Sequence, residues 1–446
     1  MSTAQRFAWL DAVSTLAMCG AAILAVPPAG GQSLWGILAG VLLVTGVCIV
    51  AFYYNDLYDF EAPHDVAELF RRLCRALGAA ALALAGAYVV APGVVLGGTL
   101  ASHALLLILG GVLALRVAAY ALAKRAPFSE RVLIVGSSPL AAELTRVIRT
   151  RPDLPLRVVG VCGDEGAAVD APRVGDYEAL PDLVRRLRPD RIVVTMPDRR
   201  HRLPVEALLA ARVRGIAVEE GTHMFERFTH RLAVESLTPS ALIFGDGFRV
   251  TRTRLAAKRV MSVAFATVAL VLTAPLMALI AAAVRLESPG PALFVQERVG
   301  LHGRRFRCFK FRTMRQGSED DGSIWERDNA SRVTRLGAVL RRYRLDELPQ
   351  FWNILRGDMS LVGPRPEMAS NVDTFSAVIP YYSLRHEVRP GLTGWAQVRA
   401  GYSMSTEEVT RKLCYDLYYI KHLSLAFDLR ILFDTVKFVL SGTRPG

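Results

Sequence analysis

Four apolar stretches fill the first quarter of the chain, at residues 7–26, 34–54, 73–95 and 100–123. Each is close to the length of about 20 residues that an α-helix needs to cross the hydrocarbon core of a bilayer. Hydrophobic residues make up 52% of the 446 residues, more than an ordinary soluble enzyme carries. We therefore predict a membrane anchor of four helices over residues 1–125, in preference to four buried helices of a soluble bundle.

The connections between these stretches alternate in charge. Residues 27–33 and 92–99 are uncharged, whereas Arg71, Arg72 and Arg75 lie in the second connection and Lys124 and Arg125 follow the fourth stretch. The positive-inside rule then places the second connection and everything after Lys124 in the cytoplasm. The formal charge of +13 alone does not separate nucleic acid, anionic lipid and phosphorylated substrate as partners.

Residues 126–250 have the pattern of an α/β domain. The runs "RVLIVG", "LRVVGVC" and "RIVVTM" are typical of buried parallel strands that alternate with helices. The turn after the first run, "GSSPLAA" from Gly136, lacks the G-x-G-x-x-G glycines that let a pyrophosphate approach the backbone. We predict a Rossmann-like domain without a working dinucleotide site, and leave open whether it binds a ligand or mediates homodimerisation.

A fifth apolar stretch, residues 260–284, differs from the first four because Pro275 lies inside it. Proline removes a hydrogen-bond donor and clashes with the preceding turn, so it kinks or breaks a helix. Basic residues flank both ends of the stretch, and a full crossing would put the rest of the chain outside the cell. We therefore predict a re-entrant membrane helix that bends near Pro275 and returns, in preference to a kinked span.

Cationic and aromatic residues alternate in "RRFRCFKFRTM", which contains Lys310. In a strand, this alternation is expected to put the aromatic side chains on one face and the charges on the other. A concentrated cationic face next to a membrane is suited to holding phosphates, whereas a solvated basic surface is the plainer interpretation.

Two adjacent acids, Asp346 and Glu347, precede a helical pattern that starts at Pro349 in "LDELPQFWNILRG". Taken alone they could be a helix cap and a first-turn acid. Arg341 and Arg365 lie nearby in sequence, and a carboxylate among cations is expected to stay ionised near neutral pH and to attack phosphorus. Since no Walker A loop is present, a nucleotide diphosphate would need Mg²⁺ held by carboxylates and its own phosphates.

From residue 252 onward the chain resembles the bacterial sugar transferases, the monotopic polyprenyl-phosphate phosphoglycosyl transferases. The resemblance rests on "SPGPALFVQERVGLHGRRFRCFKFRTM", "LDELPQFWNILRGDMSLVGPRPE", "RPGLTGWAQV" and "YDLYYIKHLSLAFDL". The whole chain is similar to the larger members, and "RAGYSMSTEEVTRKLCYDLYYIKH" is similar to the branch tied to exopolysaccharide synthesis.

The resemblance implies a reaction and a set of site residues. Asp346 would attack a UDP-sugar and become phosphoglycosylated with release of UMP, after which undecaprenyl phosphate would take the hexose 1-phosphate. Glu347 would be the partner in metal or acceptor handling, so both acids are candidate Mg²⁺ ligands. Lys310, Arg341 and Arg365 fall on phosphate-contacting positions, and Pro275 on the helix break. Arg344 departs from the family, where a small hydroxyl residue is commoner.

The expected architecture is a membrane protein of α plus α/β class. Its parts are a four-helix transmembrane anchor (1–125), a Rossmann-like cytoplasmic domain (126–250) and a mainly helical catalytic domain (251–446) with its re-entrant helix at 260–284. We expect it in the bacterial inner membrane with the catalytic domain facing the cytoplasm, in contact with lipid and without a nucleic-acid partner. The sequence does not identify the sugar or the glycan pathway.

Two other functions compete with the transferase. A membrane-anchored nucleotide-sugar dehydratase or epimerase would need an intact glycine fingerprint and a Tyr-x-x-x-Lys pair, which occurs only as Tyr120 and Lys124 at the end of the fourth stretch. A non-catalytic scaffold or ligand sensor would explain the degraded glycine loop. It would not explain the acids and cations of the C-terminal third.

Overall fold

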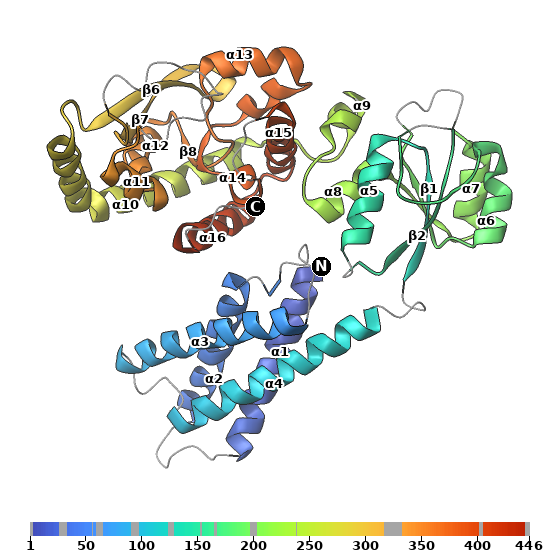
Figure 1. Cartoon of the computed structure of the whole chain (residues 1–446), viewed down its shortest axis with the longest axis horizontal. Coiled ribbons are helices and arrows are strands. Elements are labelled where there is room, and N and C mark those ends of the chain that lie inside the picture. The colour runs from blue at the N-terminus through green and yellow to red at the C-terminus, as the bar shows by residue number, and fades with distance from the viewer. Residues whose placement is uncertain are drawn as a thin grey trace. The chain divides into compact units, whose positions relative to one another are not determined.

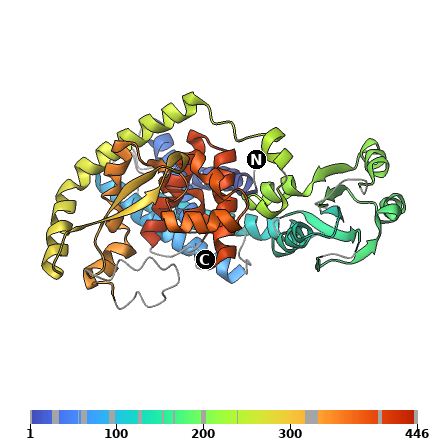
Figure 2. The same cartoon turned by 90° about the horizontal axis from the view of Figure 1, so that it is seen from above.

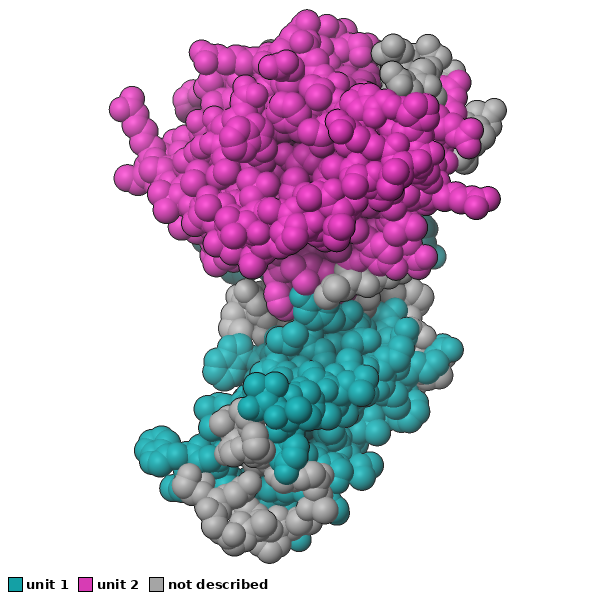
Figure 3. All heavy atoms as spheres, turned by 90° about the vertical axis from the view of Figure 1, so that its left-hand side faces the viewer, with its two compact units in different colours: residues 1–221 teal, residues 222–446 magenta. Residues whose placement is uncertain are grey.

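A computed structural model describes residues 3–25, 34–55, 57–58, 66–90, 98–123, 129–151, 154–164, 167–196, 203–237, 239–315, 332–400 and 405–441. They form two compact units, Met1–Gly221 and Thr222–Gly446 (Figure 3). The division into three domains at residues 125 and 250 stays a prediction. Residues 27–33 and 92–97, Lys124 and Arg125, on which the orientation argument rests, lie outside the described residues.

Four long helices form the N-terminal part of the first unit: α1 (Thr3–Ala25), α2 (Leu34–Tyr54), α3 (Val66–Val90) and α4 (Gly98–Ala123) (Figure 1). Each contains a segment long and apolar enough to cross a membrane. A buried ion pair joins Asp11 to Arg116 at 2.5 Å, and Arg116 also donates to the Leu57 carbonyl. The prediction of four apolar helices is confirmed.

The α/β part of the first unit contains a five-stranded sheet in the order β3-β2-β1-β4-β5. Its strands, β1 (Glu130–Val135), β2 (Leu156–Cys162), β3 (Arg173–Gly175), β4 (Arg191–Val194) and β5 (Ala217–Glu220), are all parallel. Helix α5 (Pro139–Thr150) lies on one side of the sheet, and α6 (Leu180–Leu187) and α7 (Val205–Val213) on the other (Figure 1). The predicted parallel sheet is therefore present, with two short strands that the sequence patterns did not identify.

The turn after β1 is closed against the neighbouring strand. Gly136 has a φ of +114°, and a Cβ there would lie 2.8 Å from the Met196 amide nitrogen. The Ser138 hydroxyl accepts from the Ala141 amide at the start of α5 and donates to the Thr195 carbonyl at 2.8 Å. Ser138 therefore occupies the helix start, where a dinucleotide fold would bind its pyrophosphate.

The second unit begins with α8 (Gly221–Thr229), although Gly221 itself is the last residue of the first unit. Helix α9 (Pro239–Phe244) follows, and then the longest helix, α10 (Arg252–Glu287). This helix runs without interruption through Pro275 and changes direction along its length (Figures 1 and 2). A proline inside a helix is the usual cause of such a bend. The helix bends while staying continuous, and a break at Pro275 itself stays a prediction. Whether the helix returns to the side from which it enters stays a prediction.

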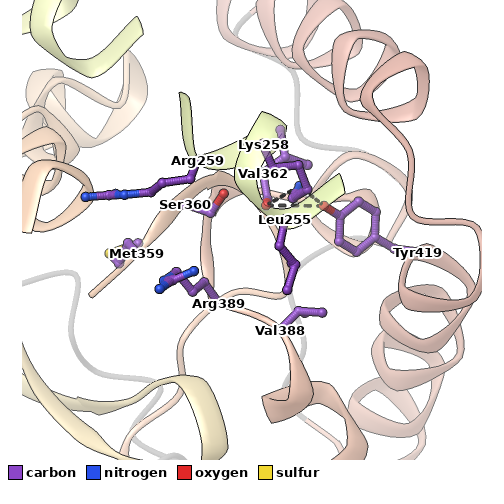
Figure 4. A pocket seen from close by; sticks show the side chains of 9 residues that line it. All are labelled: Leu255, Lys258, Arg259, Met359, Ser360, Val362, Val388, Arg389 and Tyr419. Carbon is purple, nitrogen blue, oxygen red and sulfur yellow. Dashed lines mark hydrogen bonds between the residues drawn. The ribbon is translucent and has the colours of Figure 1, made fainter. Parts of the chain in front are cut away.

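The outer side of α10 is apolar and uncovered, with Val271, Leu272 and Leu279 about 70% exposed. By length and composition this helix is a fifth candidate for contact with a membrane. Its N-terminal part is bonded to the rest of the unit. Lys258 Nζ reaches Asp428, Tyr419 Oη and the Val362 carbonyl at the pocket drawn in Figure 4. All three partners belong to the second unit, so these contacts attach the N-terminal part of α10 to the rest of that unit.

The rest of the second unit is mainly helical, as predicted. Its helices are α11 (Arg335–Arg342), α12 (Gln350–Arg356), α13 (Ala369–Val378), α14 (Trp395–Arg399), α15 (Thr406–Lys421) and α16 (Leu425–Ser441). Two small sheets complete it: the antiparallel hairpin of β6 (Leu293–Val299) and β7 (Arg305–Phe311), and the parallel pair of β8 (Ser360–Val362) and β9 (Gly391–Thr393). Buried Trp395, Tyr382 and Tyr419 lie in its core.

Candidate active site

The acidic pair lies in a 3₁₀ turn, Leu345–Glu347, between α11 and α12. We expected Asp346 and Glu347 at the start of the helix, but α12 begins at Gln350 and Pro349 precedes it. No side chain caps α12, so neither acid has the plain capping role. Arg344 starts the turn in the left-handed region, with a φ of 57°. This conformation is costly for a residue other than glycine and is typical of functional sites.

Asp346 is buried, and its Oδ1 atom has no hydrogen-bond partner among the described residues. Burial raises the pKa of this carboxyl, and the charge of Glu347 raises it further. Lys310, Arg344 and Arg365 act in the opposite direction. Loss of solvation therefore outweighs the attraction of the cations, and ionisation of Asp346 near neutral pH stays a prediction. A buried carboxylate oxygen without a partner is free to bind an incoming group.

Glu347 has the opposite environment. Its Oε1 accepts a hydrogen bond from Arg365 Nη2 at 2.8 Å and a weaker one from Arg344 Nη1 at 3.4 Å. Burial opposes its ionisation, but Arg365 and Lys310 outweigh burial and lower the pKa of Glu347 to about 2. The pKa values of the two adjacent carboxyls are thus shifted in opposite directions: Glu347 is held as a carboxylate, and Asp346 is made more basic. Such a separation is characteristic of sites that perform chemistry.

Lys310 lies on β7, on the side of the hairpin that also holds Phe306 and Cys308. Phe309 and Phe311 share the other side with Arg305 and Arg307. The predicted separation of aromatic and cationic faces is therefore wrong, because two residues separate Phe306 from Phe309. Each face of the hairpin carries both kinds of side chain.

The Lys310 ammonium acts electrostatically on Asp346 and Glu347, so the structure brings this predicted residue to the acids. It has no hydrogen bond or ion pair within the described part of the chain. Burial and the charge of Arg365 lower the pKa of Lys310, and Glu347 opposes this. Opposite Phe306 on the same face of the hairpin, Arg298 donates to the Pro366 carbonyl and so contacts the chain next to Arg365.

Arg341 does not join the acids. Its side chain is exposed on α11, and its Nε donates to Thr313 Oγ1 at 2.8 Å. It is absent from the charges that act most strongly on Asp346 and Glu347. Phosphate contact by Arg341 therefore stays a prediction, without support from these contacts.

Arg365 is held in place by closely packed glycines. It follows β8 in "GPRP", and the Gly363 amide donates to the Thr393 carbonyl while the Gly391 amide donates to the Pro364 carbonyl, both at 2.9 Å. A Cβ on Gly391 would lie 2.1 Å from the Gly363 nitrogen, and one on Gly394 would lie 2.1 Å from the Gly363 oxygen. The two motifs "GPRP" and "RPGLTG" therefore pack backbone against backbone, which only glycine allows.

A second layer behind Arg365 was missed by sequence reasoning. Buried Arg385 pairs with Asp416 Oδ2 at 2.9 Å, bonds to Tyr382 Oη at 2.7 Å, and donates from Nη2 to the Arg365 carbonyl at 2.9 Å. The signal in the sequence was weak, since Arg385 and Asp416 lie 31 positions apart in unrelated motifs.

The site as a whole has a surplus of positive charge. Six cations interact through space among these residues: Arg298, Lys310, Arg344, Arg365, Arg385 and Lys412. Four carboxyls face them: Asp346, Glu347, Glu367 and Asp416. An excess of cations around one buried, unpartnered carboxylate is suited to a multiply charged phosphate ester.

The acids also fit a limited role in binding a cation. Within the described residues, no group of three or more histidine, cysteine or acidic side chains could hold a metal ion. Mg²⁺, however, commonly binds through one or two carboxylates together with substrate phosphates. The free Oδ1 of Asp346 beside Glu347 supplies such a partial site.

Comparisons with known proteins agree with this chemistry. The family model described as bacterial sugar transferase matches residues 253–442. The chain is 50% identical over 185 residues to UDP-N-acetylgalactosamine-undecaprenyl-phosphate N-acetylgalactosaminephosphotransferase of Aeromonas hydrophila, covering 42% of this chain and 44% of that protein. It is 33% identical over 317 residues to undecaprenyl-phosphate glucose phosphotransferase of Komagataeibacter xylinus, covering 69% and 59%.

A shorter relative is covered almost completely. The chain is 38% identical over 188 residues to exopolysaccharide production protein PSS of Rhizobium leguminosarum bv. phaseoli, covering 41% of this chain and 94% of that protein. By contrast, this chain spans only about half the length of the two longer relatives. The likeness to the shorter relative involves less than half of this chain.

Proposed function

Since the chain belongs to the bacterial sugar transferase family, we propose that it transfers a hexose 1-phosphate from a UDP-sugar to undecaprenyl phosphate, with release of UMP. Membership in this family speaks against the dehydratase or epimerase and the scaffold. The observation that carries the proposal is the unpartnered Oδ1 of Asp346, buried beside a carboxylate that Arg365 and Arg344 hold. The relatives' names supply the classes of donor and acceptor.

The first half of the reaction forms a covalent intermediate. An Asp346 carboxylate oxygen attacks the β-phosphorus of the UDP-sugar, and the bond from that phosphorus to the bridging oxygen breaks. The electron pair leaves with UMP. Lys310 and Arg365 neutralise charge on the phosphate oxygens, which is the main requirement of phosphoryl transfer. Burial favours this attack, because it removes water from the carboxylate.

In the second half, a phosphate oxygen of undecaprenyl phosphate attacks the same phosphorus. Asp346 leaves as a free carboxylate, and the product is the lipid-linked diphosphate sugar. Glu347 does not compete as a nucleophile, since its oxygen is bonded to Arg365 and Arg344. Its role is to orient these two cations toward the phosphate. Mg²⁺ bound by Asp346, Glu347 and the substrate phosphates would neutralise further phosphate charge.

A membrane surface suits this pair of substrates. The apolar helices α1–α4 and the bent helix α10 provide contact with lipid, and the acceptor's isoprenoid chain stays in the bilayer while the UDP-sugar arrives from solution. We place the catalytic unit on the cytoplasmic side of the bacterial inner membrane, with α10 re-entrant at Pro275. Exopolysaccharide synthesis is the pathway class suggested by the Rhizobium relative's name. Homodimerisation stays open.

The test is UMP release from a panel of UDP-sugars that includes UDP-glucose and UDP-N-acetylgalactosamine. Detergent-solubilised full-length protein is assayed with and without undecaprenyl phosphate and Mg²⁺. We expect sustained UMP formation only with donor, acceptor and Mg²⁺, and the fastest donor identifies the sugar. Formation of UDP in place of UMP would mean a simple glycosyltransferase and would refute the proposal.

A further inference from the structure

Lys412 is a half-buried cation on α15 to which the mechanism above gives no role. Its ammonium group forms no hydrogen bond or ion pair with any described residue. An ammonium group withdrawn from water without a partner costs folding free energy. An anion bound beside it would remove this cost.

The position of Lys412 relative to Arg365 is set by bonded contacts. Asp416 lies one helical turn after Lys412 on α15, so the two side chains share a face of that helix. Asp416 pairs with Arg385 at 2.9 Å, and Arg385 donates to the Arg365 carbonyl at 2.9 Å. Lys412 is therefore fixed on the helix face that supports Arg365.

Arg365 is the cation that two groups of charges share. On one side, Lys310 acts on Asp346, Glu347 and Arg365. On the other, Lys412 acts on Arg365, Arg385, Asp416 and Glu367. Lys412 thus interacts with the same arginine as Lys310 does, and its ammonium group has no hydrogen-bond or ion-pair partner among the described residues.

The carboxyls near Lys412 already have other partners. Asp416 is paired with Arg385, and Glu367 lies 3.9 Å from Arg298. Burial lowers the pKa of Lys412; Glu367 opposes this, and Arg365 adds to it. The local charge therefore leaves room for an added anion.

A nucleotide diphosphate sugar presents two neighbouring phosphates. The one bonded to the sugar must lie at Asp346 for attack, and the other, next to it, needs a further cation. We propose that Lys412 binds the second phosphate, the α-phosphate that leaves as UMP. This inference rests on the proposed function and adds a residue for the leaving group.

The charge balance explains the use of such a residue. As the Asp346 oxygen bonds to the β-phosphorus, the bond to the bridging oxygen breaks and its electron pair stays on the α-phosphate. A cation placed there neutralises the charge that develops in the transition state. UMP bound as a product carries this negative charge in full, so its phosphate should interact with the same cation. Loss of Lys412 should therefore weaken UMP binding and slow the first half-reaction.

The experiment compares Lys412→Met, which keeps the aliphatic stem, with Lys412→Arg, which keeps the charge. Arg411→Met, which removes the exposed neighbouring cation on the same helix, is the matched control. We measure the inhibition constant of UMP against the UDP-sugar and the KM for undecaprenyl phosphate. For Lys412→Met we expect UMP inhibition to weaken by about 10- to 100-fold, the range for one charge-assisted hydrogen bond. The acceptor KM should stay unchanged, and Lys412→Arg should recover most of the affinity.

An unchanged inhibition constant for UMP in Lys412→Met would overturn the inference. A raised acceptor KM with unchanged UMP inhibition would assign Lys412 to the acceptor phosphate. Equal weakening of both, with a lower Tm, would mean a structural role. If wild-type protein releases no UMP from any donor, the proposed function fails, an outcome distinct from these.

Discussion

Arg365 Nη2 donates to Glu347 Oε1 at 2.8 Å, so this arginine binds the neighbour of the proposed nucleophile and leaves Asp346 Oδ1 without a partner. The pair makes Glu347 a fixed anion and keeps Arg365 next to the position of a substrate phosphate. Removing the arginine should therefore disturb both the charge state of Glu347 and the binding of phosphate.

We predict that Arg365→Met lowers kcat/KM by about 100-fold or more, the range for losing a charged donor in a buried site. The pKa of Glu347, lowered to about 2 chiefly by Arg365 against its burial, should rise. Activity should then decline at a higher pH on the acid side than in the wild type. A pH–rate profile of each protein checks this, with Arg356→Met, at the far end of α12, as control. If the loss of activity on the acid side occurred at the same pH in Arg365→Met as in the wild type, the proposed role of the Arg365–Glu347 pair would be contradicted.

Asp346→Asn should stabilise the protein while abolishing turnover. A carboxyl whose pKa is raised on folding binds its proton more tightly in the folded state, so its ionised form opposes folding at neutral pH. We expect a gain on the order of 1 kcal/mol at pH 7.5, typical for a relieved functional site. The gain should shrink as pH falls and the wild-type carboxyl protonates.

Glu347→Gln is the matched control for that measurement. The pKa of Glu347 is lowered, so its ionised form stabilises the fold above its ordinary value near 4.5, and this contribution is lost as pH falls toward 2. The substitution should therefore lower the Tm at pH 7.5. Thermal melts of both variants in detergent check whether the Tm rises for Asp346→Asn and falls for Glu347→Gln. A lower Tm for Asp346→Asn would contradict the stabilisation predicted for that variant.

The buried pair of Arg385 and Asp416 should act through Arg365. Arg385→Met leaves Asp416 buried without its partner, which typically costs about 3–5 kcal/mol. The double variant Arg385→Met with Asp416→Leu should recover much of the Tm. Its kcat should stay low, because the Arg365 carbonyl still lacks its donor. Recovery of both stability and activity would show that the pair does not position Arg365.

The direction of α10 can be tested by labelling. If the helix is re-entrant, cysteines introduced as Arg254→Cys and Pro289→Cys, at exposed positions near its two ends, should react with an impermeant thiol reagent from the cytoplasmic side only. The background is a variant without the six native cysteines. Labelling of Pro289→Cys from the opposite side would establish a full crossing.

The sequence was most informative where periodicity or motif spacing carried the signal. Helix length and hydropathy predicted the apolar helices, and strand runs predicted the parallel sheet. The acids, Lys310 and Arg365 could be selected from motifs. The sign of the pKa shift of Asp346 could not, because it depends on how much water burial removes. The support of Arg365 by Arg385 likewise depends on the tertiary packing of α15.

The most direct test of the account is to trap the intermediate on Asp346. Full-length protein is incubated with its UDP-sugar and Mg²⁺ but without acceptor, quenched, digested and analysed by mass spectrometry. The account predicts a mass increase of one hexose phosphate unit on the peptide that contains Asp346, formed together with UMP and absent in Asp346→Asn. An adduct on another residue, or UMP release undiminished in Asp346→Asn, would contradict it.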